Sequence, residues 1–144
     1  MPLGSRRKAR SRMSYRSIPQ PTTGLHYREL IVWRKAMDMA KEIYLLASLL
    51  PKEETVGLRS QLTRASSSVS ANIAEGWTRE TDPDRAHFLA IAQGSLAETD
   101  TLLTLAEELN LIPTERSTIA RELLVEVSKM LSTLRKQLRE RKRR

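Results

Sequence analysis

Apolar side chains recur at spacings of three and four residues along most of the chain, which is the pattern of amphipathic α-helices. Four such stretches follow one another, and no segment alternates with a period of two over a useful length. The predicted apolar stripes are Leu30, Trp33, Met37, Ala40, Tyr44, Ala47 and Leu50; Val56, Leu58, Leu62, Ala65, Val69 and Ile73; Ala86, Leu89, Ala92, Leu96, Thr99, Leu103, Ala106 and Leu109; and Ile119, Leu123, Val127, Met130, Leu134 and Leu138.

Turn and capping residues set the predicted limits of the first two helices. The first begins at about Tyr27 and stops before Pro51, which cannot continue the backbone hydrogen bonds. The second starts near Glu53 and runs to about Glu75. Gly76 then fits the left-handed residue that often follows a helix.

The last two helices have similar signals. Asp82 is the expected N-cap of the third helix, with Pro83 at its first position. This helix ends near Asn110, and Pro113 opens the fourth helix, which we expect to fray beyond Leu138. The sequence therefore predicts an all-α protein, an antiparallel up-down-up-down four-helix bundle.

Small residues mark where helices approach closely. The segment 65–74 is rich in Ser and Ala, and we expect its buried hydroxyls to bond carbonyls one turn back. Gly94 lies in the middle of the third helix, where glycine costs about 1 kcal/mol relative to alanine. Close approach of another helix is the expected compensation.

The net charge of +8 is unevenly distributed. Residues 1–26 and 135–144 carry +6 each, whereas residues 27–134 carry −4. We therefore divide the chain into a disordered basic tail at 1–26, the bundle at 27–138 and a basic tail at 139–144. Basic tails attract polyanions such as nucleic acid. The candidate nucleic-acid-binding residues are Arg6, Arg7, Lys8, Arg10, Arg12, Arg59, Arg64, Arg139, Arg141, Lys142, Arg143 and Arg144.

Several classes of protein are disfavoured. The chain has no cysteine, and its two histidines are too few for a histidine-rich metal site. It carries no Gly-rich phosphate loop and none of the paired Glu-x-x-His ligands of di-iron bundles. We expect no enzyme activity, no cofactor and no metal. Without a long apolar run or a signal core, we expect a cytoplasmic protein that does not enter a membrane.

A strip of polar residues follows one face of the second helix and continues onto the third. It can contact nucleic acid or a neighbouring subunit, or it can be an internal network that fixes the register of the bundle. We favour a structural or subunit-interface role, with Glu98 pairing with Arg64 or Ser68. The strip consists of Gln61, Arg64, Ser68, Asn72, Glu75, Gly76, Gly94, Ser95 and Glu98.

Two tryptophans receive different predictions. Trp33 lies on an apolar stripe and is expected in the core. Trp77 follows a helix end and is expected either in an exposed contact or packed against another subunit. A scattered set of basic residues around the second helix could form a patch, although such charges are usually only solvated. These residues are Lys52, Arg59, Arg64 and Arg79.

Three segments carry a family resemblance: 30–36 with Ile43-Tyr44, 57–76 with its Asn-Ile-Ala-Glu-Gly end, and 88–98. The chain resembles the four-helix-bundle proteins encoded within intervening sequences of bacterial large-subunit ribosomal RNA genes. One departure is Ser70, where the family more often has proline. The resemblance implies a bundle that assembles as a ring-like homopentamer. A similar bundle is the accessory protein of diversity-generating retroelements, which binds nucleic acid and reverse transcriptase.

These observations lead to a functional hypothesis. We expect a non-enzymatic, homo-oligomeric accessory protein that binds the backbone of RNA or DNA. The alternative is an oligomeric adaptor between proteins that binds no nucleic acid. A weaker third possibility is an enzyme with a pocket between subunits, for which the sequence offers no convergent titratable groups.

Overall fold

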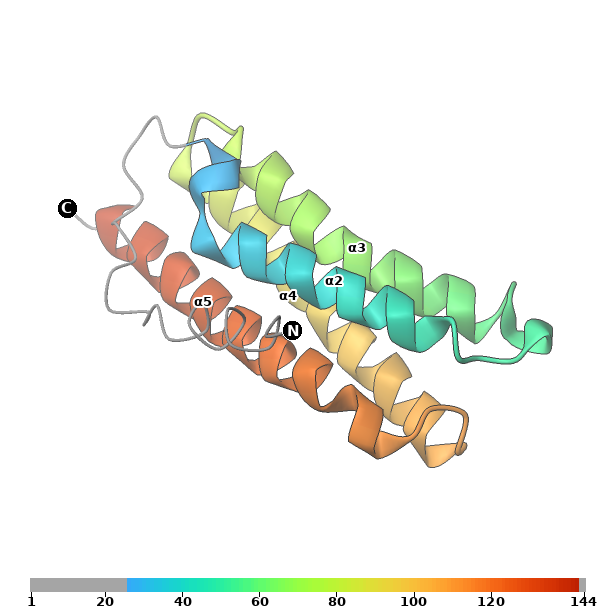
Figure 1. Ribbon diagram of the computed structural model, residues 1–144. Helices are drawn as coiled ribbons and strands as arrows, with labels where there is room; N and C mark the ends of the chain where they lie inside the picture. Colours follow the sequence, from blue (N-terminus) through green and yellow to red (C-terminus); the bar gives the residue numbers. More distant parts are fainter. Residues whose placement is uncertain (1–25, 143–144) are drawn as a thin grey trace, which may run out of the picture.

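A computed structural model describes residues 26–142, which form four α-helices, with short 3-10 turns before α2, between α2 and α3, and between α4 and α5 (Figure 1). The helices are α2 (Ile31–Ala47), α3 (Leu58–Trp77), α4 (Asp82–Glu108) and α5 (Thr118–Lys142), with turns η2 (Tyr27–Glu29), η3 (Lys52–Glu54) and η4 (Thr114–Ser117). The predicted all-α class is confirmed over this part of the chain. The candidate binding residues Arg6, Arg7, Lys8, Arg10, Arg12, Arg143 and Arg144 lie outside the described residues.

The helices run alternately up and down. α2 packs against α3 and α5, and α4 packs against the same two helices, so the chain closes a four-cornered bundle. Figure 1 shows that consecutive helices are antiparallel. As a consequence, the start of α2 and the end of α5 lie at the same end of the molecule, which we call the terminal end.

The core extends along the whole bundle, and the stripe predicted for α4 is almost entirely correct. Leu89, Leu103 and Ala106 have no exposed surface, and only Leu109 at the end of the stripe is exposed, at 55 %. Phe88, Ile91 and Leu102 lie outside this stripe and are half-buried or exposed, so the stripe matched the buried face although apolar residues also occur at other positions of α4.

The stripe predicted for α2 was shifted by part of a turn. Met39 and Ile43 are fully buried, whereas Tyr44 is 51 % exposed. Trp33 and Met37 are only half-buried. Apolar residues stand next to one another at several positions of this helix, so two overlapping stripes fit the spacing and packing selects the other one.

Two predicted core residues near helix starts are also exposed. Val56 is 89 % exposed because α3 begins only at Leu58, after η3 and a turn. Ile119 is 52 % exposed, and Leu123 is half-buried. The buried residues of α5 include Ala120, Leu124 and Leu131, one position away from the predicted stripe at several turns.

The left-handed C-terminal residue occurs at a different helix from the one predicted. Gly76 lies inside α3 and is buried, and its backbone does not have a positive φ. Asn110 instead has φ 58° after α4, and Leu111 N donates to Ala106 O at 2.9 Å. This six-residue bond is the Schellman arrangement, which asparagine tolerates better than most residues.

Two further boundaries differ from the predicted ones. Thr81 rather than Asp82 is the N-cap of α4, because its hydroxyl accepts a hydrogen bond from Asp84 N at 3.3 Å. α5 continues past Leu138 to Lys142. Leu138 is buried, and Arg141 Nε lies 3.3 Å from Asp82 Oδ2, so the last turn is attached to the start of α4.

The buried hydroxyls of α3, those of Ser66 and Ser70, bond their own helix as predicted. Ser66 donates to Thr63 O at 3.0 Å, and Ser70 donates to Ser67 O at 3.2 Å. Both side chains are almost completely buried. Because each hydroxyl is satisfied within α3, a neighbouring helix can pack against this surface without leaving a polar group unpaired.

Candidate functional site

The polar strip joins α3 to α4 at its centre. Ser68 Oγ and Ser95 Oγ are 2.9 Å apart, and Asn72 Nδ2 donates to Ser68 Oγ at 2.9 Å and to Ser68 O at 2.8 Å. These three side chains are half-buried, so they form a small network between the helices. Gln61, Arg64 and Glu75 lie on the exposed border of the strip.

Gly94 does not lie against another helix, which contradicts the prediction. A β-carbon at Gly94 would meet no atom beyond its own stretch of helix within 4 Å, and the residue is exposed. Gly76 is the glycine that permits close packing: a β-carbon there would lie 2.7 Å from Phe88 Cβ. Packing within the bundle therefore does not explain why a glycine occupies the middle of α4.

Arg64 and Glu98 do not pair. Both side chains are exposed, and neither makes a hydrogen bond or ion pair with another described residue. Ile91 and Leu105 are exposed on α4 as well, at 39 % and 44 %. We call this surface, with Gly94 in its middle, the α3–α4 face; it combines unpaired charges of both signs with exposed apolar residues.

Two of the scattered basic residues near α3, Arg59 and Arg79, have separate local roles. Arg59 donates from Nε to Ala47 O at 3.1 Å and from Nη2 to Leu50 O at 2.5 Å, which satisfies carbonyls at the end of α2. Arg79 pairs with Glu75 at 3.1 Å and lies over the Phe88 ring. The basic side chains at these positions therefore have local partners.

Trp77 is buried, contrary to the prediction of an exposed contact. It belongs to the last turn of α3 and is 8 % exposed. The Arg85 guanidinium carbon lies 5.5 Å from the centroid of its ring. The helix continues through Gly76, so Trp77 points into the bundle instead of leaving it in a loop.

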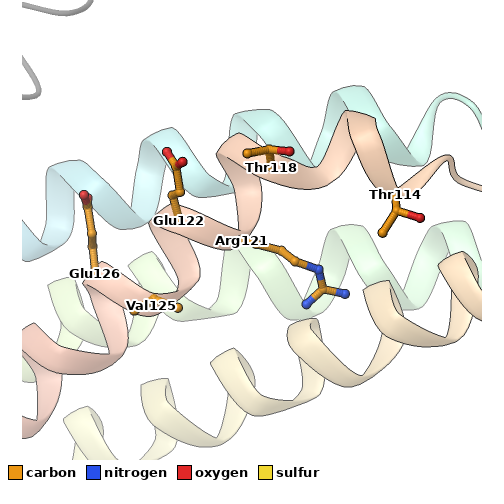
Figure 2. A pocket seen from close by; sticks show the side chains of 6 residues that line it. All are labelled: Thr114, Thr118, Arg121, Glu122, Val125 and Glu126. Carbon is orange, nitrogen blue, oxygen red and sulfur yellow. The ribbon is translucent and has the colours of Figure 1, made fainter.

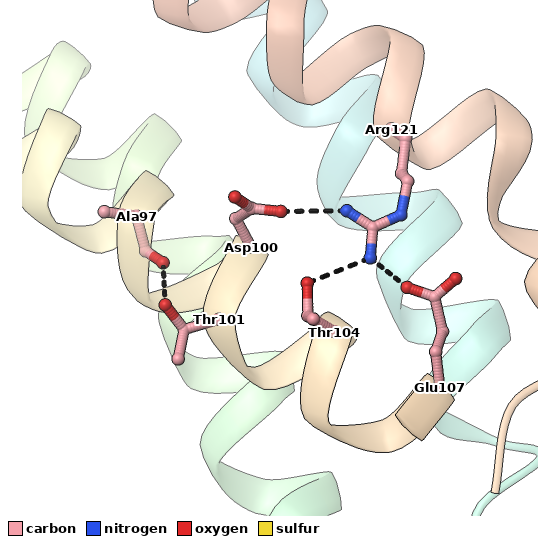
Figure 3. Close-up of polar contacts among 6 residues, drawn as sticks. All are labelled: Ala97, Asp100, Thr101, Thr104, Glu107 and Arg121. Carbon is pink, nitrogen blue, oxygen red and sulfur yellow. Dashed lines mark hydrogen bonds and ion pairs between the residues drawn. The ribbon is translucent and has the colours of Figure 1, made fainter. Parts of the chain in front are cut away.

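Arg121 connects α5 to α4 through three acceptors (Figure 3). Its Nη1 lies 2.9 Å from Asp100 Oδ1, and its Nη2 donates to Thr104 Oγ1 at 3.1 Å and to Glu107. The hydrogen bond to Glu107 is the largest contribution that raises the pKa of Arg121, against the lowering effect of burial. The sequence analysis missed this cluster, because its members are separated by up to 21 positions.

A shallow, open pocket lies beside this cluster, along η4 and α5 (Figure 2). Its lining side chains do not converge: Thr118 and Glu122 point to one side of α5, whereas Arg121 points toward α4. Since Arg121 is already engaged by carboxylates, the pocket offers no free group for an anion. It is lined by Thr114, Thr118, Arg121, Glu122, Val125 and Glu126.

Among residues 26–142 we find no group of three or more His, Asp or Glu side chains that could hold a metal ion. None of the helices in this range is long and apolar enough to cross a membrane.

The basic end of α5 lies at the terminal end of the bundle. Lys136 and Arg139 are exposed and make no contact with described acidic residues, whereas Arg135 donates to Gln93 Oε1. The described part of the chain also begins at this end, with the start of α2. The exposed basic residues Lys136 and Arg139 therefore lie at the end of the bundle where the described chain begins.

The comparison with known families agrees with this architecture. The model of the 23S rRNA-intervening sequence protein family matches residues 28–133, which include α2, α3, α4 and most of α5. A comparison with curated proteins gives no match. The matched segment covers well over half of the chain and all four corners of the bundle, so the chain belongs to the 23S rRNA-intervening sequence protein family.

Proposed function

We propose that this protein is a non-enzymatic, homo-oligomeric accessory protein that binds the phosphate backbone of RNA or DNA. The observation that carries the proposal is the position of the two chain ends. α2 begins and α5 ends at the terminal end, so the segments 1–26 and 135–144, which carry +6 each in the sequence, are joined to the bundle at the same end.

The charges of the bundle itself also differ between its two ends. The half away from the terminal end, residues 39–67 and 93–129, contains ten acidic and seven basic side chains. The rest of the chain contains seven acidic and 18 basic side chains. A polyanion is therefore attracted to the terminal end and repelled by the opposite one.

The α3–α4 face supports the homo-oligomeric part of the proposal. An exposed glycine in the middle of a helix costs about 1 kcal/mol, and nothing in the same chain compensates for it. Close approach by a helix of a second copy would supply the compensation. Arg64 and Glu98 can then pair between copies, since the two charges have no partner among the described residues.

The first experiment measures binding of structured RNA and duplex DNA by the full chain at several salt concentrations. Phosphate contacts predict a log–log slope of about −0.9 per contact on duplex DNA. Replacing Arg6, Arg7 and Lys8 by Gln should make the slope less steep. The matched control replaces Lys41, Lys52 and Arg116, three exposed basic residues in the other half of the bundle, and should leave the slope nearly unchanged.

Self-association is measured separately by sedimentation. Gly94→Leu fits within a single bundle and should dissociate the oligomer, whereas Thr133→Leu on exposed α5 should not. Weak, salt-insensitive association with nucleic acid would reject the binding function and favour a protein adaptor. A wild-type chain that sediments as a monomer would reject the oligomer.

A further inference from the structure

Aromatic and arginine side chains gather at the beginning of α2. The Tyr27 and Trp33 rings meet edge to face with centroids 5.4 Å apart. The Arg28 guanidinium carbon lies 5.9 Å from the Tyr27 centroid and 5.6 Å from the Trp33 centroid, and that of Arg34 lies 5.6 Å from Trp33. We call Tyr27, Arg28, Trp33 and Arg34 the aromatic–arginine cluster.

The cluster is partly open to solvent. Tyr27 and Trp33 are half-buried and pack with part of their surface against the core, whereas Arg28 and Arg34 are exposed. Arg34 pairs with Asp38 at 3.2 Å. The Arg28 guanidinium lies near the two rings and has no hydrogen bond or ion pair with another described residue. Core closure explains the buried parts of the rings but does not require this unpaired guanidinium.

The position of the cluster adds a second argument. It lies at the terminal end of the bundle, immediately after the basic residues 1–26. The His26 ring, which is exposed, lies 4.3 Å from the Tyr27 ring between centroids. Aromatic faces beside a positive charge are the combination by which proteins hold single-stranded nucleic acid.

We propose that the aromatic–arginine cluster stacks an unpaired base of single-stranded RNA or DNA. The proposal rests on the nucleic-acid binding proposed above and gives it a preference for single strands over duplexes. A base would stack on the open part of the Tyr27 or Trp33 ring, and Arg28 would pair with the adjacent phosphate. Bases in a duplex are already stacked on their neighbours, so a duplex gains only the charge contacts.

Binding of 12-nucleotide oligo(dT), oligo(rU) and a 12-base-pair DNA duplex tests the preference. Tyr27→Leu in the full chain should weaken binding of at least one single strand by about 5- to 150-fold, the range for loss of one stacked base. Duplex affinity should remain unchanged. The matched control is Tyr44→Leu in α2, because Tyr44 is 51 % exposed and has no guanidinium over its ring among the described contacts.

Fluorescence gives a readout that does not depend on a destabilising variant. Trp33 and Trp77 are the two tryptophans of the chain, and Trp77 is buried. In Trp77→Phe, with helicity checked by circular dichroism, single strands should quench the remaining Trp33 emission and the duplex should not. The wild-type chain should show the same difference with a smaller amplitude.

The outcomes separate the two proposals. If the full chain binds no nucleic acid at low salt, the proposed function fails and the stacking site fails with it. If it binds single strands and duplex equally, without Trp33 quenching and without loss in Tyr27→Leu, only the stacking site is overturned. A preference for oligo(rU) over oligo(dT), or the reverse, identifies which nucleic acid the cluster holds.

Discussion

The two glycines inside α3 and α4 have opposite surroundings. Gly76 faces Phe88 of α4 at a distance that leaves no room for a methyl group, and Gly94 faces open space. Intrinsic helix propensity favours alanine at both positions. The effect of an added methyl group on stability is therefore determined by packing at Gly76 and by helix propensity at Gly94.

We predict that Gly76→Ala lowers the free energy of unfolding by about 1–3 kcal/mol, as expected for overpacking. Gly94→Ala should raise it by up to about 1 kcal/mol. Denaturant unfolding at low protein concentration measures both variants. Equal effects of the same sign would contradict the different surroundings of the two residues.

Asn110 carries the strained backbone of the α4–α5 connection. Since its φ is 58°, an alanine there costs about 1 kcal/mol of stability, whereas glycine does not. We therefore expect Asn110→Ala to lower the unfolding midpoint and Asn110→Gly to maintain or raise it. Thermal unfolding of the two variants beside the wild type tests this order.

The backbone conformations of Gly76 and Asn110 could be predicted only in part from the sequence. Both Gly76 and Asn110 are typical of helix ends, and spacing alone cannot distinguish them. Gly76 lies within the helix because Phe88, twelve positions away, packs against its α-carbon. Contacts between helices of this kind leave no local signal in the sequence.

Among the elements, the pair α4 and α5 is held by a charged contact as well as by the core. The Glu107 side chain is only 7 % exposed, and its Oε2 has no hydrogen-bond partner among the described residues. Asp100, on the same arginine, is 59 % exposed. The buried Glu107 carboxylate therefore needs Arg121 as a counter-ion, whereas the Asp100 carboxylate is largely solvated by water.

We predict that Arg121→Met costs about 2–3 kcal/mol of stability, because it leaves Glu107 buried without its counter-ion. Asp100→Asn should cost less than about 1 kcal/mol, since exposed pairs contribute little. Urea unfolding provides the comparison. A second change, Glu107→Gln, should recover part of the loss in Arg121→Met; no recovery would show that the loss comes from side-chain packing instead.

The helices themselves could be predicted well from the sequence, and the reason is visible in their composition. In α4 the series of residues at spacings of three and four from Leu89 to Ala106 matched the buried face of the helix. In α2 and α5, neighbouring apolar residues permit two faces, and only contact with the other helices selects one. The Arg121 cluster and the aromatic–arginine cluster were missed, since each depends on residues that the folded chain brings together.

For the molecule as a whole, the unequal distribution of charge predicts the orientation of a bound polyanion. Reversing Lys136 and Arg139 to Glu at the terminal end should weaken duplex binding at low salt by at least tenfold. Reversing Lys52 and Arg116 changes the net charge equally, and it should weaken binding by less than threefold. Electrophoretic titration of both variants measures the difference. Equal losses would mean that net charge alone, without orientation, governs binding.

The common position of the two chain ends also makes the protein suitable for circular permutation. A short linker from the end of α5 to the start of α2 would preserve all four helices, because both points lie at the terminal end. New termini in the connection between α2 and α3 would then emerge at the opposite end. Transferring the basic segments to these termini would move the positive region without altering the core, so the order in which the helices are connected would determine the end of the bundle that a nucleic acid approaches.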